Sequence, residues 1–311
     1  MKKNQEILAT FTKEALPSLD VVVLGALELF SEVTVPAIDF TRFKRPLVVG
    51  SGNAAVTGKL LFDDVDAVFA DESSYQNKLA TIPTIDGAFL ISASGSKHAV
   101  SIVKTLVEKK LPTLLLTNNE TAPVKEFLPP ESVFVFPKNR EPYTYNTSTY
   151  LGMVLSKTKE DAAHIQSFIE NEVATDIPTD LISYTAFYFI VPEAFSDVRD
   201  MFKTKFDELF GSKLMGRICT VEQTKHAKTV VENEHELFVS FGQDNDVFGL
   251  PHNRITIGLP QECDYAAMIA VGYYFIGHIQ RQFPQYYNQN IERYVQETSE
   301  IFGSTIKSIV E

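Results

Sequence analysis

Three serines, a glycine and a lysine occur together in the segment Ser92–Lys97, and their hydroxyl and ammonium groups could bind an anion. The preceding residues 88–91 are all apolar, as expected of a strand buried inside a parallel sheet. Apolar residues then recur at helical spacing up to Pro112. A turn between a parallel strand and a helix offers backbone N–H groups and the positive end of the helix dipole. The segment therefore predicts a phosphate-binding turn; the alternative is an ordinary turn in which one serine caps the helix.

The order of these elements resembles the sugar isomerase (SIS) domain. In that family a strand runs into S-x-S-G-x-T, a helix follows, and the next strand ends in T-N. Here the turn is Ser92–Lys97, and the second strand ends in Thr117-Asn118. Lys97 stands where the family usually has threonine, so a strongly hydrated cation would replace a hydroxyl at the phosphate.

Two further segments are similar to SIS landmarks. Leu47–Asn53 resembles the first strand and its glycine-containing turn, and Glu141–Thr149 resembles the E-x(3-4)-S-T-K segment that leads into a helix. The resemblance implies a sugar phosphate as ligand and a homodimer whose subunits share their sites. The substrate-binding residues that it implies include Ser51, Ser92, Ser94, Ser96 and Lys97 at the phosphate, and Asn146 and Thr147 along the sugar. Asn53 is expected to bind substrate as well.

Aldose–ketose chemistry needs a group that opens the sugar ring and a base that moves the proton between C1 and C2. SIS isomerases and deglycases use a histidine and a glutamate, and Val221–Ala227 is the only comparable segment here. The resemblance implies His226 as the ring-opening group and Glu208 as the nearest base. Glu222 is the second candidate base, because it is four residues from His226 and would share its helix face. The alternative for this pair is a solvated ion pair on a polar helix.

Two C-terminal features receive separate expectations. The resemblance implies that a terminal lysine enters the pocket, and Lys307 could take that place, although an exposed helix lysine is the alternative. The C-terminal aromatic residues are expected in the core and at an interface rather than around a ligand. They are Tyr273, Tyr274, Phe275, Phe283, Tyr286 and Tyr287.

Composition limits the class of protein. The chain has 311 residues, which favours two domains, and a net charge of −12, which argues against nucleic acid as partner. No apolar run is long enough to cross a membrane, and no signal peptide is expected at the start of the sequence. The two cysteines, Cys219 and Cys263, have neither metal-ligand nor disulfide spacing. We therefore expect a cytoplasmic protein with no metal and no cofactor.

Strand and helix patterns alternate along the chain, which predicts parallel α/β sheets. The expected architecture is two SIS-type α/β/α repeats, the second abbreviated, with domains at 1–174 and 175–311. The second repeat has no serine turn; Phe241–Val247 supplies only a short acidic loop. The expected strands are 46–49, 67–70, 88–91, 113–117, 132–136, 187–191, 214–220, 236–241 and 254–259.

Three functional classes follow from these features. The first is a sugar-phosphate aldose–ketose isomerase or a fructosamine-6-phosphate deglycase. The second is a phosphosugar sensor without catalysis, favoured by Ala227-Lys228 in place of the family's Gly-Pro after the histidine. A nucleotide-binding enzyme is disfavoured, because Gly50-x-Gly52 is followed by Ala55 where a third glycine is needed.

Overall fold

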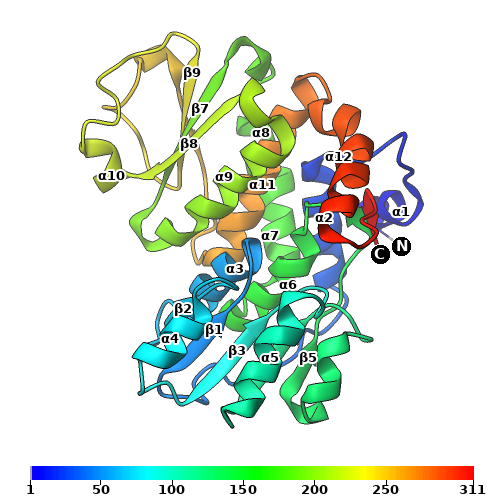
Figure 1. The fold of residues 1–311 in the computed structure, drawn as a ribbon. Coiled ribbons are helices and arrows are strands. Elements are labelled where there is room, and N and C mark those ends of the chain that lie inside the picture. The colour runs from blue at the N-terminus through cyan, green and yellow to red at the C-terminus, as the bar shows by residue number, and fades with distance from the viewer. Residues whose placement is uncertain (1) are drawn as a thin grey trace. The chain divides into compact units, whose positions relative to one another are not determined.

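The computed structural model describes residues 2–311 and divides the chain into two compact units, each with its own parallel sheet (Figure 1). The serine-turn unit comprises Val33–Lys138 and Thr149–Lys159. The terminal unit comprises the chain up to Glu32 together with Asn139–Ser148 and Glu160–Glu311. Each unit is described by itself.

The serine-turn unit contains a five-stranded parallel sheet with the order β2-β1-β3-β4-β5. Its strands are β1 (Pro46–Val49), β2 (Val68–Ala70), β3 (Gly87–Ile91), β4 (Thr113–Thr117) and β5 (Val133–Val135). From β1 the chain goes to β2, which pairs with one edge of β1, and then to β3, which pairs with the other edge of β1. The winding direction therefore reverses between β1 and β3, and crevices for ligands open at such a reversal, beyond the carboxyl ends of the strands.

Different helices cover the two faces of this sheet. Leu90 shares a core with Leu106 on one face, whereas Phe89 packs with Leu61 and Met153 on the other. The helices are α3 (Asn53–Leu61), α4 (Tyr75–Thr81), α5 (His98–Glu108) and α6 (Thr147–Thr158), with 3₁₀ turns at Pro123–Phe127 and Pro130–Ser132. The predicted layered α/β arrangement is confirmed.

The terminal unit contains a four-stranded parallel sheet with the order β10-β9-β7-β8. Its strands are β7 (Ala186–Val191), β8 (Met215–Thr220), β9 (Glu236–Phe241) and β10 (Arg254–Ile257). The winding repeats that of the first sheet, because β7 also lies between the second and third strands of its unit. Only a 3₁₀ turn at Pro251–Asn253 precedes β10, where the first sheet has the long helix α5. The abbreviated second copy is thus confirmed.

The terminal unit contains the helices α1 (Lys3–Thr10), α2 (Leu19–Phe30), α7 (Ala162–Phe168), α8 (Ala174–Asp176), α9 (Arg199–Phe210), α10 (Val221–Lys225), α11 (Tyr265–Gln282) and α12 (Tyr286–Phe302). Among them, α2 and α9 pack against the long helix α11, whereas α10 packs against β7 and β8. A π-helical turn at Ile169–Val173 joins α7 to α8, and shorter 3₁₀ turns cover Leu181–Ser183, Glu193–Val198 and Gly211–Lys213.

The two N-terminal helices belong to the terminal unit. The expected boundary at residue 174 would instead group them with the first sheet. The close approach of α2 to α11 explains this grouping. A Cβ on Gly277 would lie 2.1 Å from the Asp20 nitrogen, so only glycine admits this contact. The Gln280 side chain also accepts a hydrogen bond from the Leu19 N–H at 2.9 Å.

The C-terminal segment β11 (Ile309–Val310) pairs antiparallel with β6 (Glu141–Pro142). The Tyr143 N–H donates to the Ser308 carbonyl at 2.8 Å, which extends this pairing by one residue. The segment that follows Glu141 is therefore fixed on one side by the end of the chain.

Candidate functional site

The serine turn connects β3 to α5, as the sequence predicts, and its side chains bond to its own backbone. The Gly95 N–H donates to the Ser92 hydroxyl at 3.1 Å, and the hydroxyls of Ser94 and Ser96 lie 2.8 Å apart. Thr117, at the end of β4, donates its hydroxyl to the Ala93 carbonyl at 3.1 Å. The turn is therefore an ordered loop, with the exposed Ser94 at its surface.

No serine caps helix α5. The residue before the helix is Lys97, whose φ of 51° and ψ of −116° lie in a region that glycine adopts freely, and within the described chain its side chain makes no capping bond. Helix N-termini without a capping side chain leave N–H groups for an external acceptor. The simple capping alternative is thus wrong, and the turn retains the features of an anion site.

Gly95 is required by the packing of the turn. Its φ is +59°, and a Cβ there would lie 2.5 Å from the Ala122 Cβ and 3.0 Å from a Val124 methyl. The Gly95 carbonyl also accepts the Val124 N–H at 3.1 Å. The turn is therefore fixed against the 3₁₀ segment that follows β4.

A second turn, after β1, lies beside the serine turn because β1 and β3 are neighbours in the sheet. It contains the half-buried residues Ser51 and Asn53, and Gly52 precedes α3 with a φ of 56° and a ψ of −126°. This conformation is close to that of Lys97 before α5, so the two helices begin in the same way. The five predicted phosphate ligands and Asn53 thus lie in the two turns at the reversal point of the sheet.

The conformation of Lys97 supports a testable prediction. Strain of ~1–3 kcal/mol is typical of a non-glycine residue in such a region. We expect Lys97→Gly to raise the free energy of unfolding by about 1 kcal/mol, because the relieved strain exceeds the added entropy of the unfolded chain. The same change should weaken phosphate binding, because a cation is lost. Chemical denaturation and phosphate titration measure the two effects.

Lys109→Gly is the matched control, since Lys109 ends the same helix with an ordinary φ of −78°. It should lower the free energy of unfolding by ~0.5–1 kcal/mol. A Lys97→Gly variant that is less stable than the wild type would contradict the proposed backbone strain at Lys97.

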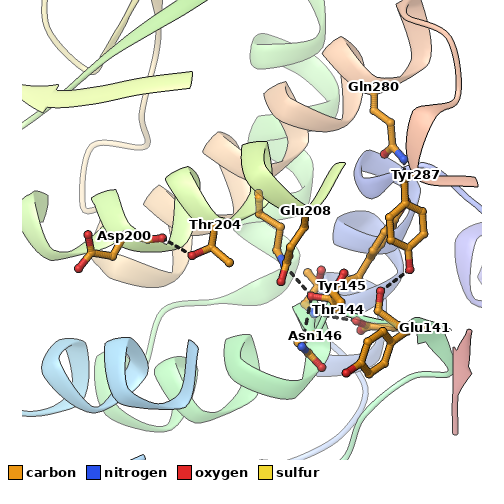
Figure 2. Close-up of polar contacts among 12 residues, drawn as sticks. Glu141, Thr144, Tyr145, Asn146, Asp200, Thr204, Glu208, Gln280 and Tyr287 are labelled. Carbon is orange, nitrogen blue, oxygen red and sulfur yellow. Dashed lines mark hydrogen bonds and ion pairs between the residues drawn. The ribbon is translucent and has the colours of Figure 1, made fainter. Parts of the chain in front are cut away.

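A second group of candidates lies in the terminal unit, around Glu208 near the end of α9. Lys205, one turn earlier and fully buried, donates to the Glu208 carboxylate and to the Thr144 carbonyl, both at 2.6 Å. The Asn146 side chain donates to the same carbonyl at 3.2 Å. Figure 2 shows Glu208 beside the Thr144–Asn146 segment. Glu208 and Asn146 are thus brought together through Lys205 and Thr144.

Two residues of this segment have left-handed backbones. Thr144 has a φ of 73° and Asn146 a φ of 50°, and a β-branched residue in this region is a strained outlier. Glu141 stabilises the start of α6, since its buried carboxylate accepts the N–H groups of Thr147 and Ser148 at 2.7 Å and the Ser148 hydroxyl. Thr147 is itself buried, and its N–H is taken up by the Glu141 carboxylate.

Burial controls the acidity of both carboxyl groups. Desolvation raises the pKa of Glu141, and the bonds from Ser148 and Thr147 oppose this shift. Desolvation also raises the pKa of Glu208, while the charge and hydrogen bond of Lys205 lower it. A glutamate with a raised pKa is suited to accept and return a proton near neutral pH.

Glu208 lines a cavity of about 670 Å³ within the terminal unit. The wall is formed by the end of α9, the following 3₁₀ turn, the first half of α12, and Thr144. Tyr286 and Tyr287 are part of the wall, and Tyr287 is also buried, as the sequence predicts. Volumes of ~300–1,000 Å³ are typical of small-molecule sites.

His226 and Glu222 are placed differently from the sequence expectation. Helix α10 ends at Lys225, and His226 has non-helical angles, so the shared helix face predicted for the two residues is wrong. Both are exposed, and Glu222 pairs with Lys225. His226 follows the carboxyl end of β8, whereas Glu208 precedes its amino end, and a six-residue strand spans ~20 Å. Lys307 is exposed in the C-terminal segment.

Lys205 and Thr144 are residues that the motifs do not identify. A signal for Lys205 exists, because this lysine lies on the apolar face of α9 with Phe202, Phe206 and Leu209. No sequence signal identifies the strained conformation of Thr144.

Within residues 2–311, no group of three or more potential metal-binding side chains is found, and no helix is long and apolar enough to span a membrane. Cys219 and Cys263 are free and half-buried. Asp71, which a nucleotide site would use for ribose, accepts hydrogen bonds from both the backbone and the hydroxyls of Ser73 and Ser74.

No protein-family model matches the chain, and no curated protein matches it significantly. Solved structures do. A hypothetical protein from Thermus thermophilus is 14% identical, with a TM-score of 0.62 over 97% of this chain and 94% of that one. The C-terminal domain of glucosamine-fructose-6-phosphate aminotransferase from Francisella tularensis is 12% identical, with a TM-score of 0.60 over 88% and 98% of the two chains.

Tagatose-6-phosphate ketose/aldose isomerase from Escherichia coli is 13% identical, with a TM-score of 0.57 over 82% of this chain and 85% of that one. Identities of this size establish a shared fold alone. The fold of the chain is therefore that of phosphosugar isomerases and related phosphosugar proteins.

Proposed function

We propose that the chain binds a sugar phosphate through the serine turn and catalyses proton transfer between C1 and C2 of the open-chain sugar. The observation that carries this proposal is the uncapped serine turn at the reversal point of the first sheet, where hydroxyls, N–H groups and a lysine meet. The likeness to solved structures named for sugar-phosphate chemistry supports it. Ser51, Ser92, Ser94, Ser96 and Lys97 would bind the phosphate, and Asn53 would be a further substrate-binding residue.

Glu208 is the proposed base, with Asn146 and Thr147 in the segment that would line the sugar. Its ionised carboxylate would take the proton from the carbon next to the carbonyl and return it to the neighbouring carbon. The hydroxyl on the carbon that loses its proton gives its own proton to the former carbonyl oxygen, in the same direction, so isomerisation needs no co-reactant. The charge and hydrogen bond of the Lys205 ammonium lower the pKa of Glu208 and so oppose the effect of burial.

His226 is the proposed ring-opening group. Lys307 is a second proposal, as the terminal lysine that would enter the pocket. Because His226 and Glu208 lie beyond opposite ends of β8, His226 would act at the Glu208 site of a second subunit. Its exposure leaves it accessible to such a partner. The proposed active form is therefore a homodimer. We further propose that it acts in the cytoplasm and uses no metal and no cofactor.

Two variants of this function are open. In a deglycase, the same proton transfer on an amine-linked fructose 6-phosphate is followed by addition of water, which releases the amine and the sugar phosphate. In a sensor, the turn binds the phosphate but no proton is transferred. The separation of His226 from Glu208 within one chain favours the sensor if the protein proves monomeric.

Turnover and binding distinguish these possibilities. The purified chain is incubated with hexose 6-phosphates and with a fructosamine 6-phosphate, products are followed by NMR, and binding is followed by thermal shift. The enzyme proposal requires turnover that His226→Ala abolishes while binding persists. Binding without turnover would establish the sensor, and stabilisation by NAD alone would contradict both.

The pH dependence of activity should respond to Lys205. Since Glu208 must be ionised to act as base, kcat rises with pH through its raised pKa. Removing the Lys205 ammonium removes an effect that lowers this pKa, so Lys205→Met should move the acid limb to higher pH. Lys203→Met, at an exposed position of the same helix, should leave the profile in place. An unmoved acid limb in Lys205→Met would contradict the assignment of Glu208.

A further inference from the structure

The buried amide of Gln280, near the end of α11, joins two segments that are far apart in the sequence. Its Oε1 accepts the Leu19 N–H at 2.9 Å, and its Nε2 donates to the Tyr145 hydroxyl at 2.7 Å. The Tyr145 hydroxyl in turn donates to the Pro17 carbonyl at 3.2 Å. Gln280 is 3% exposed and Tyr145 is 1% exposed, so solvent has little access to these bonds. We call this chain of three hydrogen bonds the Gln280 bridge.

Each group in the Gln280 bridge has a defined role. The Leu19 N–H can only donate, which directs the amide oxygen of Gln280 toward α2 and the amide nitrogen toward Tyr145. Burial raises the pKa of Tyr145, so its hydroxyl stays protonated and can donate to the Pro17 carbonyl. Every polar atom of the two side chains therefore has a partner, and a buried network satisfied in this way holds its members in one arrangement.

The bridge fixes the middle of the segment that reaches Glu208. Tyr145 lies between Thr144 and Asn146, whose φ angles of 73° and 50° are both left-handed. Neither residue is glycine, so this backbone persists only where its surroundings impose it. Figure 2 shows the Tyr145 side chain extending from this segment toward Gln280. The Gln280 bridge is therefore one of the contacts that impose the conformation.

The strained segment reaches Glu208 through Lys205. The Thr144 carbonyl accepts a hydrogen bond from the Lys205 ammonium at 2.6 Å, and the same ammonium donates to the Glu208 carboxylate at 2.6 Å. Lys205 is fully buried, so its charge depends on both acceptors. Relaxation of Thr144 would remove one acceptor, and it would open the surroundings of Lys205 and Glu208 to water.

We propose that Gln280 is a positioning residue for Glu208, which it holds in place through Tyr145, Thr144 and Lys205. The residues that line the cavity do not include Gln280, so it acts on the reaction only through these neighbours. This inference rests on the proposed function, because it assumes that Glu208 is the base. It adds a residue of α11 to a site otherwise built from α9, α12 and the Thr144 segment.

Gln280→Leu and Tyr145→Phe each break the bridge at a different member. Misplacement of a catalytic group by about 1 Å can cost ~10²-fold in rate, so each variant should lower kcat by ~10–100-fold. KM should change little, because the serine turn is untouched. Desolvation is the largest cause of the raised pKa of Glu208, so water beside a relaxed Thr144 should lower this pKa. The acid limb of kcat should then move to lower pH, opposite to the shift expected for Lys205→Met.

Gln282→Leu is the matched control on the same helix. The Gln282 side chain also makes two hydrogen bonds, accepting the Leu181 N–H at 2.8 Å and donating to the Pro178 carbonyl at 2.9 Å. Neither partner lines the cavity. Gln282→Leu should therefore lower the melting temperature about as much as Gln280→Leu does, yet leave kcat and its pH profile unchanged.

An NMR titration of the isotope-labelled Glu208 carboxyl, assigned by comparison with Glu208→Gln, tests the positioning without a substrate. The pKa of Glu208 should fall in Gln280→Leu and in Tyr145→Phe and stay in place in Gln282→Leu. If the wild type turns over no sugar phosphate, the proposed function fails, whereas this titration still decides the role of Gln280. An unmoved Glu208 pKa in folded Tyr145→Phe, or an equal shift in Gln282→Leu, would overturn the positioning role.

Discussion

Glu208→Gln is expected to lower kcat for the isomerisation or deglycation by ~10²–10⁴-fold, the contribution typical of a positioned general base. The amide has the same shape as the carboxylate and can still accept the hydrogen bond from Lys205, which donates to it at 2.6 Å. It cannot take a proton from carbon. Substrate affinity should change little, because the serine turn that is proposed to bind the phosphate is untouched. Initial rates and titration calorimetry on the same preparation measure both quantities.

Glu222→Gln is the control, and it also decides between the two candidate bases. Glu222 is exposed and pairs only with Lys225 on its own short helix, so its loss should leave kcat unchanged. The free energy of unfolding of Glu208→Gln should be measured in parallel, since the variant leaves the buried Lys205 without a counter-charge. Glu208→Asp, which keeps the charge but shortens the side chain, should retain more activity than Glu208→Gln. Equal activity in Glu208→Gln and wild type would remove Glu208 from the mechanism.

The second large effect is expected for Gly95→Ala in the serine turn. The new Cβ would lie 2.5 Å from the Ala122 Cβ. The backbone at this position has a positive φ, which a residue with a side chain adopts only with strain. Strain and overpacking together should lower the free energy of unfolding by about 2–4 kcal/mol. Displacement of the turn should abolish stabilisation by hexose 6-phosphates. Denaturant melts with and without ligand give both results.

Gly303→Ala separates backbone strain from the clash. Gly303 has almost the same φ, +60°, but among the described residues beyond its two chain neighbours no atom lies within 4 Å of the position its Cβ would take. Gly303→Ala should lower the free energy of unfolding by ~1–2 kcal/mol and leave the stabilisation by hexose 6-phosphates intact. A Gly95→Ala variant that still responds to hexose 6-phosphates as the wild type does would show that the turn does not bind the phosphate.

The fold and the serine turn follow from local sequence. Each strand of the first sheet is a short apolar run ended by turn residues, and the serines follow one of these runs directly. The position of Ser92–Lys97 beyond a carboxyl strand end is therefore set by neighbours in the chain. Resemblance to SIS segments adds the β1 turn and Glu141, whose sequence motifs are also contiguous. The conformation of Lys97, by contrast, is visible only in the structure.

The surroundings of Glu208 depend on contacts between residues far apart in the sequence. Lys205 meets the Thr144 carbonyl across 61 residues, and the cavity joins α9 to α12. No periodicity encodes these distances, because they result from how α9, α11 and α12 pack. The sequence spacing of Glu222 and His226 indicated one helix face, but α10 ends between them. Sequence alone determined the parallel sheets and the position of the serine turn at a strand end, while tertiary packing decided which carboxylate is buried, paired and open to a cavity.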